Sequence, residues 1–137
     1  MSSIARTGYH PMLLLAGRSL LATLFLVAGI RKALTFAVSA AYFTRLGFPL
    51  PEVMVVVAII IEVGCALLLI AGWKTRSVAW LLALFVLIAT FMGHRFWEFE
   101  PAYFPNQLNH FLKNFAVIGG LMLVAAAGPG SASVEKA

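Results

Sequence analysis

The fold class is decided by residues 53–72, VMVVVAIIIEVGCALLLIAG, which carry a single charged side chain, that of Glu62. About 20 apolar residues are what a helix needs to cross the ~30 Å hydrocarbon core of a bilayer. At ~1.5 Å per residue, Glu62 lies roughly 13 Å from Val53, close to the middle of that layer. A carboxylate at this depth costs ~2.5 kcal/mol or more, so it is expected to face the interior of a helix bundle and to have a polar partner.

The composition extends this interpretation to the whole chain. Hydrophobic residues make up 62% of the sequence and charged residues 11%, and the mean hydropathy is +0.97, which excludes an ordinary soluble domain. We therefore expect one all-α membrane domain over residues 1–137, a four-helix transmembrane bundle. Its spans are expected near residues 12–31, 53–72, 77–96 and 109–127. Residues 33–46 are amphipathic and end before Pro49 and Pro51, which predicts a short interfacial helix after the first span.

The net charge of +5 and the pI near 9.9 raise the question of nucleic-acid binding. The basic residues are scattered at the span ends without a basic run, so the expected partners are membrane lipids and not nucleic acid. They divide evenly between the two ends of the bundle. Lys74 and Arg76 crowd a very short loop, which favours the orientation with both termini in the cytoplasm. Cys65 is the one cysteine, so an intrachain disulfide is excluded and a packing role is expected.

Three polar residues near the start of the fourth span are predicted to share one helix face. His110, Lys113 and Asn114 are spaced at i, i+3 and i+4. Lys113 is expected ~7 Å deep in the membrane and Glu62 ~13 Å deep, a difference that the flexible lysine stem can bridge. The sequence therefore predicts a Glu62–Lys113 ion pair. More broadly, the carboxylate is expected within salt-bridge or single-water distance of Lys113, Asn114, His110 or Arg18.

Other polar groups end the neighbouring spans. Lys32 ends the first span and His94 ends the third, both on the side of the Lys113 stripe, while Arg18 lies nearer the opposite side. A structural interpretation stands beside the functional one: Lys32 and His94 as interface anchors, and Arg18 as a contact to lipid headgroups. No metal is expected, because His94, His110 and Glu62 lie on three helices at different depths. The sequence contains no CxxCH, GxGxxG or HExxH motif, so no cofactor is expected in the chain itself.

Several runs of the sequence resemble the DoxX family of small bacterial membrane proteins. They are GRSLLATLFLVAGIRKALTF (17–36), LGFPLPEVMVVVAIIIEVGCALLLIAGWKTRSVAW (46–80), FMGHRFWEF (91–99) and HFLKNFAVIGGLMLVAAAGPG (110–130). The family is similar to a subunit of a thiosulfate:quinone oxidoreductase, and relatives are associated with membrane oxidoreductase complexes. The resemblance therefore implies a location in the bacterial inner membrane and a soluble or membrane oxidoreductase subunit as a partner. It does not imply a specific reaction.

The leading hypothesis is a membrane subunit of, or accessory to, an oxidoreductase, with a polar cavity that binds a quinone or a small redox substrate. Glu62 would exchange protons, and His94 or His110 would relay them near neutral pH. The residues expected to bind substrate are Lys113, Asn114, Arg18 and Lys32. The alternative is a non-catalytic membrane scaffold or a small-solute carrier, in which the same polar cluster orders the bundle. Small residues of the fourth span, among them Gly119 and Gly120, would then allow close contacts within the bundle or across a homodimer.

Overall fold

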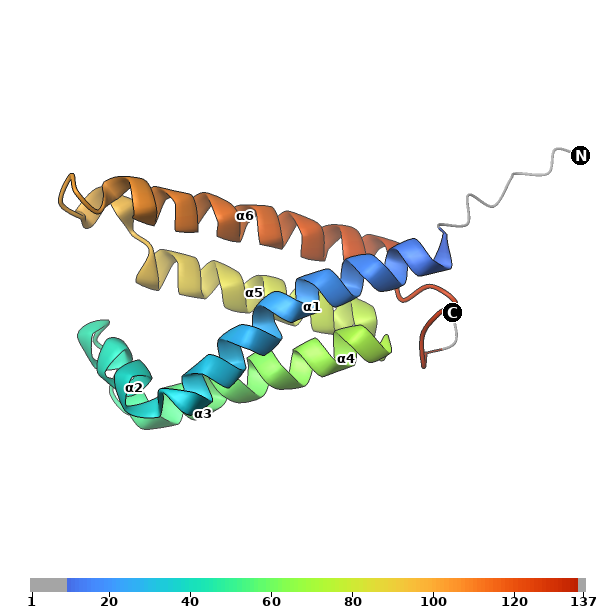
Figure 1. Ribbon diagram of the computed structural model, residues 1–137, viewed down its shortest axis with the longest axis horizontal. Coiled ribbons are helices and arrows are strands. Elements are labelled where there is room, and N and C mark those ends of the chain that lie inside the picture. Colours follow the sequence, from blue (N-terminus) through green and yellow to red (C-terminus); the bar gives the residue numbers. More distant parts are fainter. Residues whose placement is uncertain (1–9, 136–137) are drawn as a thin grey trace, which may run out of the picture.

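The computed structural model describes residues 10–135, and all regular structure in that part of the chain is helical. Four helical segments are long and apolar enough to cross a membrane, which confirms the predicted all-α architecture. The segments are α1 (Pro11–Leu34), α3 (Pro51–Ile59) continued through η1 (Ile60–Gly64) into α4 (Cys65–Ala71), α5 (Thr75–Gly93), and α6 (Phe104–Ala127). The predicted amphipathic segment forms a helix of its own, α2 (Phe36–Arg45), between the first two spans (Figure 1).

The span boundaries on either side of the connection between α5 and α6 differ from the sequence prediction. The third span ends at Gly93, and the chain turns at His94 into a short 3-10 helix, η2 (Phe96–Glu98). The fourth span begins at Phe104, five residues earlier than expected. Pro105 lies in its first turn, where the missing N–H of a proline costs no hydrogen bond, so this proline starts the helix and does not interrupt a loop.

The bundle is packed at one end and splayed at the other. The start of α1 lies beside the end of α6, and from there α1 crosses towards α3 and α4 (Figure 1). α5 and α6 form an extensively packed antiparallel hairpin, which diverges from α2 and α3 at the opposite end. The fully buried core lies in the packed part, and its members include Ala22, Ala66, Leu69, Leu82 and Leu121. The splayed half is where a cavity forms.

The second span contains a π-helical segment, η1, and Glu62 lies within it. π-helical turns are rare and occur mostly as single bulges within α-helices, frequently at functional sites. α1 approaches this bulge closely at Gly29, where a Cβ atom would lie 2.6 Å from Cγ2 and 3.3 Å from the backbone nitrogen of Val63. No side chain fits between the two helices at this position, so glycine is required for the approach.

The composition of SASVEKA (131–137) predicts a short free tail, but the described part of this segment is held against the bundle. Up to Glu135 it folds back over the end of α4 (Figure 1). The backbone N–H of Val134 donates to the carbonyl of Ala71 at 2.9 Å, and that of Glu135 donates to the carbonyl of Gly72 at 3.1 Å. These contacts satisfy the otherwise unpaired carbonyls of a helix end. Composition alone does not reveal them, and the prediction of a free tail is wrong for this reason. Residues 1–9 and 136–137 lie outside the described part.

Candidate functional site

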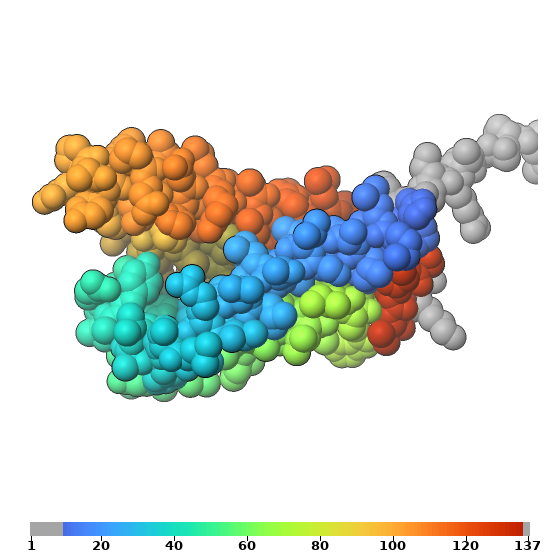
Figure 2. All heavy atoms as spheres, viewed as in Figure 1, coloured from blue at the N-terminus to red at the C-terminus, as the bar shows by residue number. Residues whose placement is uncertain are grey.

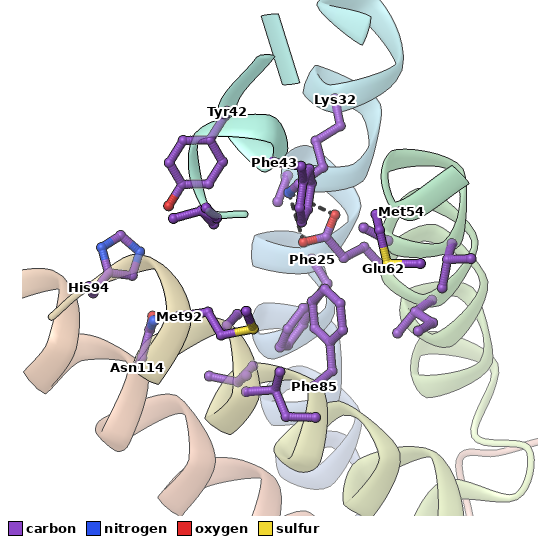
Figure 3. Close-up of a pocket in the computed structure, with 18 of the residues that line it drawn as sticks. Phe25, Lys32, Tyr42, Phe43, Met54, Glu62, Phe85, Met92, His94 and Asn114 are labelled. Carbon is purple, nitrogen blue, oxygen red and sulfur yellow. Dashed lines mark hydrogen bonds and ion pairs between the residues drawn. The ribbon is translucent and has the colours of Figure 1, made fainter. Parts of the chain in front are cut away.

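A cavity of about 490 Å³ occupies the splayed half of the bundle, between α1, α2 and α3 on one side and α5 and α6 on the other. Figure 2 shows the corresponding hollow between the cyan α2 segment and the orange start of α6. Most of the wall is apolar, with Phe25, Phe43, Phe85, Met54 and Met92 among the side chains around it (Figure 3). The polar lining residues are Lys32, Tyr42, Glu62, His94, Lys113 and Asn114. The cavity therefore brings together polar groups from all four spans, although His110, which was expected among them, does not line it.

Glu62 forms an ion pair with Lys32. The lysine Nζ lies 2.9 Å from each of the two carboxylate oxygens, as the dashed lines in Figure 3 show. The Glu62 side chain is 6% exposed and that of Lys32 is 27% exposed, so the carboxylate is enclosed while the ammonium borders the cavity. The expectation that Glu62 faces the bundle interior and has a polar partner is met.

The identity of the predicted partner was wrong. Lys113 lines the cavity, but its ammonium is more than 4.0 Å from the Glu62 carboxylate, and so are Arg18 and His110. The reason is the close approach of α1 to η1 at Gly29, which places Lys32, about one helical turn further on, directly beside Glu62. α6 lies across the cavity from η1. Lys113 on α6 therefore lines the same cavity but does not form an ion pair with Glu62.

Asn114 and Lys113 form the opposite wall of the polar end. The side-chain amide of Asn114 donates to Oγ1 of Thr90 at 3.0 Å, and that hydroxyl donates in turn to the Val86 carbonyl at 2.6 Å. This chain fixes the orientation of the Asn114 amide and leaves its second N–H and its oxygen without a partner among residues 10–135. Lys113 has no carboxylate within 4.0 Å and no hydrogen-bond acceptor in the same residues.

His94, which lines the cavity, is stacked on His110. The ring centroids of His94 and His110 are 4.9 Å apart, with an angle of 21° between the planes. His94 lines the cavity, and its Nδ1 is 2.9 Å from Oε1 of Gln107 (Figure 3). Because an amide oxygen only accepts hydrogen bonds, that contact places a proton on Nδ1 and leaves Nε2 to exchange with a ligand or solvent. His110 is not part of the cavity lining and lies behind His94.

Tyr42 was not among the predicted site residues. It lies on α2, and its hydroxyl extends across the mouth of the cavity towards the carbonyl of Gly93 at the end of α5, at 3.5 Å. Burial raises the pKa of Tyr42 above its usual value, with a smaller opposing effect of Arg45, so the phenol stays protonated at physiological pH and can donate. The amphipathic pattern of residues 33–46 predicts the helix α2. The position of α2 over the cavity, however, depends on the turn that follows α1.

Arg18 does not belong to this site. It is 1% exposed and lies at the packed end of the bundle. Its guanidinium donates to the carbonyls of Leu69 at 2.9 Å and Ala132 at 2.8 Å, and also to those of Ile70 and Pro129. Arg18 therefore does not join the cavity in which a substrate-binding role was predicted for it, and the carbonyls at the end of α4 and in the folded-back tail occupy most of its donors.

No group of three potential metal-ligating side chains is close enough to hold an ion within residues 10–135.

Comparison with known proteins gives consistent matches along the chain. The profile of the DoxX family matches residues 13–95. Inner membrane protein YphA of Escherichia coli K12 is 33% identical over 128 residues, which cover 93% of this chain and 91% of the relative. Inner membrane protein YqjF of the same organism is 32% identical over 124 residues, which cover 89% and 88%. No solved structure matches this chain significantly.

Proposed function

This chain belongs to the DoxX family of membrane proteins, and from that premise we propose that it serves an oxidoreductase system of the bacterial inner membrane by binding a quinone or a related redox-active compound. The observation that carries the proposal is the cavity. It combines apolar, partly aromatic walls with a polar end in which several hydrogen-bond donors have no acceptor among residues 10–135. Its volume of about 490 Å³ lies within the range of small-molecule sites, roughly 300–1,000 Å³.

The chemistry of the lining residues suits a quinone ring. Such a ring is flat and apolar and carries two carbonyl oxygens that accept hydrogen bonds. The ammonium of Lys113 and the second N–H of the Asn114 amide supply donors for one carbonyl. The walls around Phe25 and Phe85 supply apolar contacts for the ring itself.

Proton exchange is assigned to Glu62 and His94. Conversion of a quinone to a quinol takes up two electrons and two protons. In this proposal a partner oxidoreductase supplies the electrons, and the cavity-lining residues supply the protons. Glu62, paired with Lys32, holds or releases a proton inside the bundle, and His94 connects the cavity to its mouth.

The test is a binding measurement on the purified full-length protein in lipid nanodiscs. Lipids extracted from the protein are analysed for quinone by mass spectrometry, and a short-chain quinone is then titrated into delipidated protein. We expect Lys113→Ala to weaken binding about tenfold or more, as for the loss of one hydrogen bond to a charged group. Glu62→Gln should abolish the proton-coupled reaction with the partner enzyme. Glu52→Gln is the matched control, because it changes an exposed carboxylate at the start of the same span.

The absence of quinone binding to the wild-type protein would refute the proposal. Equal losses in the Glu52 and Glu62 variants would refute the role of the cavity carboxylate.

A second function is favoured by one observation, namely that Lys32 contacts both oxygens of Glu62, as in a structural pair. The protein would then act as a non-catalytic scaffold or a solute carrier. Gly120 packs against Leu21 of α1, whereas a Cβ atom on Gly119 would meet no atom within 4 Å in the described part of the chain. The face at Gly119 is thus open for a homodimer or a partner subunit. Copurification of a stable oxidoreductase subunit with a variant that cannot bind quinone would support the scaffold.

A further inference from the structure

We infer that the cavity selects an acidic ligand: a membrane-dissolved ring compound whose ionised oxygen pairs with Lys113. This inference rests on the proposed function and specifies the chemical class of the compound. It depends on the balance of charge in the cavity, on the unused hydrogen-bond donors and on the opening of the cavity towards lipid.

The charges that line the cavity do not cancel. Lys32 and Glu62 neutralise each other through two contacts of 2.9 Å. Lys113 is the remaining formal charge in the lining, and His94 is the one further titratable group that adds positive charge there when protonated. The cavity therefore has a net charge of about +1, which an anion would balance.

No other carboxylate of the described chain is positioned to neutralise Lys113. Glu52 is exposed at the start of α3, and Glu98 pairs with Arg95 at 3.2 Å. Glu100 is exposed in the turn before α6, and Glu135 accepts from the backbone N–H of Thr75 at the opposite end of the bundle. Lys113, which is an exposed residue, therefore has no counter-charge within this part of the chain.

Donors for an oxyanion remain unused in the same region. Lys113 has three N–H donors without an acceptor among residues 10–135, and Lys32 has one N–H beyond the two that contact Glu62. Asn114 has a second amide N–H. Hydrogen bonds to an ionised acceptor are roughly twice as strong as neutral ones, and apolar walls strengthen them further. A neutral carbonyl would gain less from the same three groups.

The cavity is open to the hydrocarbon layer. Val57 of α3 and Ile88 of α5 line it and are 42% and 52% exposed, and Leu24 of α1 is 39% exposed on another side. These residues lie within segments that are long and apolar enough to cross a membrane, so the part of their surface outside the cavity would face lipid. An alkyl or isoprenoid tail can pass between the helices there while the acidic ring faces Lys113. The ligand is therefore an amphiphile that reaches the cavity from the membrane.

The experiment compares two compounds that share a ring and a tail. One is a 3-alkyl-2-hydroxy-1,4-naphthoquinone, whose acidic hydroxyl is ionised near neutral pH. The other is the corresponding 3-alkyl-2-methyl-1,4-naphthoquinone, which is neutral. Both are titrated into full-length protein in nanodiscs of neutral phosphatidylcholine. We expect the hydroxylated compound to bind about tenfold or more tightly, the ratio for one hydrogen bond to a charged group.

The preference should depend on Lys113. Lys113→Met should reduce the ratio of the two dissociation constants to near one, and Lys113→Arg should retain most of it. Arg31→Met is the matched control, since it removes an exposed cation beside Lys32 that does not line the cavity, and it should leave the ratio unchanged. If Lys113→Met unfolds the protein, the Lys113→Arg variant and the wild-type ratio still decide the question.

Each outcome separates the inference from the proposed function. Equal binding of the two compounds to the wild type would overturn the acidic-ligand inference and leave quinone binding standing. Binding of neither compound would overturn both. Dodecanoate is the third probe: if it binds as tightly as the hydroxyquinone while the neutral quinone does not bind, the site takes a simple acidic amphiphile and the quinone function is wrong. A preference that persists in Lys113→Met would show that it does not depend on Lys113, and would overturn the assignment of this residue.

Discussion

Removal of Lys32 is the most direct perturbation of the cavity. Lys32→Met keeps much of the apolar stem of the side chain and removes the cation, so the 6% exposed carboxylate of Glu62 loses both of its 2.9 Å contacts. Removing one partner of a buried ion pair typically costs ~3–5 kcal/mol. Because Lys32 is itself 27% exposed, the lower end, ~3 kcal/mol, is the better estimate.

That free energy corresponds to a large change in melting temperature. For a domain of this size, each kcal/mol shifts the Tm by roughly 3–5 °C, so we expect Lys32→Met to lower it by about 10 °C. The double variant Lys32→Met/Glu62→Leu should recover most of the loss, because it removes the buried charge together with its partner. Arg31→Met, the matched exposed control in the same helix, should change the Tm little.

The assay can use the protein's own thiol. Cys65 is the one cysteine of the sequence and is 6% exposed, so a maleimide dye reports its exposure during heating. Circular dichroism measured in parallel separates loss of helix from local opening near Cys65. An unchanged Tm in Lys32→Met would refute the reasoning that the pair stabilises the bundle. A double variant that keeps the full proton-coupled reaction with the partner enzyme would refute the assignment of proton exchange to Glu62.

Further variants test the elements that build the site. Gly29→Ala should lower the Tm and weaken ligand binding, because the added methyl group would lie 2.6 Å from Cγ2 of Val63. Gly17→Ala is the control: its methyl group would meet no atom within 4 Å in the described structure, so this change should be neutral or stabilising by up to ~1 kcal/mol. Tyr42→Phe should increase the association and dissociation rates of the ligand together, measured by stopped flow, because it removes the 3.5 Å contact that closes the mouth; unchanged rates would contradict that role. Arg18→Met should lower the Tm by several degrees without a change in the ligand dissociation constant, since its acceptors are the backbone carbonyls at the packed end; a selective loss of binding would contradict its structural assignment.

The spans and the burial of Glu62 followed from the sequence because they depend on local composition and on the cost of a charge in the membrane. Residues 53–72 are apolar enough to span whatever their neighbours are, and a carboxylate there needs a partner wherever the helix sits. The choice of partner depends instead on which helix comes closest. Depth alone allowed Lys113 as well as Lys32, and the deciding feature is Gly29, whose role as a contact point appears only in three dimensions.

Tyr42 and the folded-back tail were missed for a related reason. Their roles depend on turns that bring distant segments together, and neither segment has an unusual composition. This sequence contains one weak indication that the tail folds back. Arg18 lies within a span and therefore requires hydrogen-bond acceptors, which the carbonyls of a helix end can supply. Which carbonyls these are is decided by the packing of α4 and of residues 129–132 around the guanidinium.

The number of unused donors separates the structural cations of this bundle from the one available to a ligand. The guanidinium of Arg18 has five N–H groups and contacts four carbonyls, so little capacity remains for an additional acceptor. Lys32 uses two of its three N–H groups on Glu62. Lys113 uses none within residues 10–135, although it borders the same cavity as that pair. Lys113 is exposed and borders the cavity, so among the cations of the cavity lining it has the most donors available to a ligand that enters.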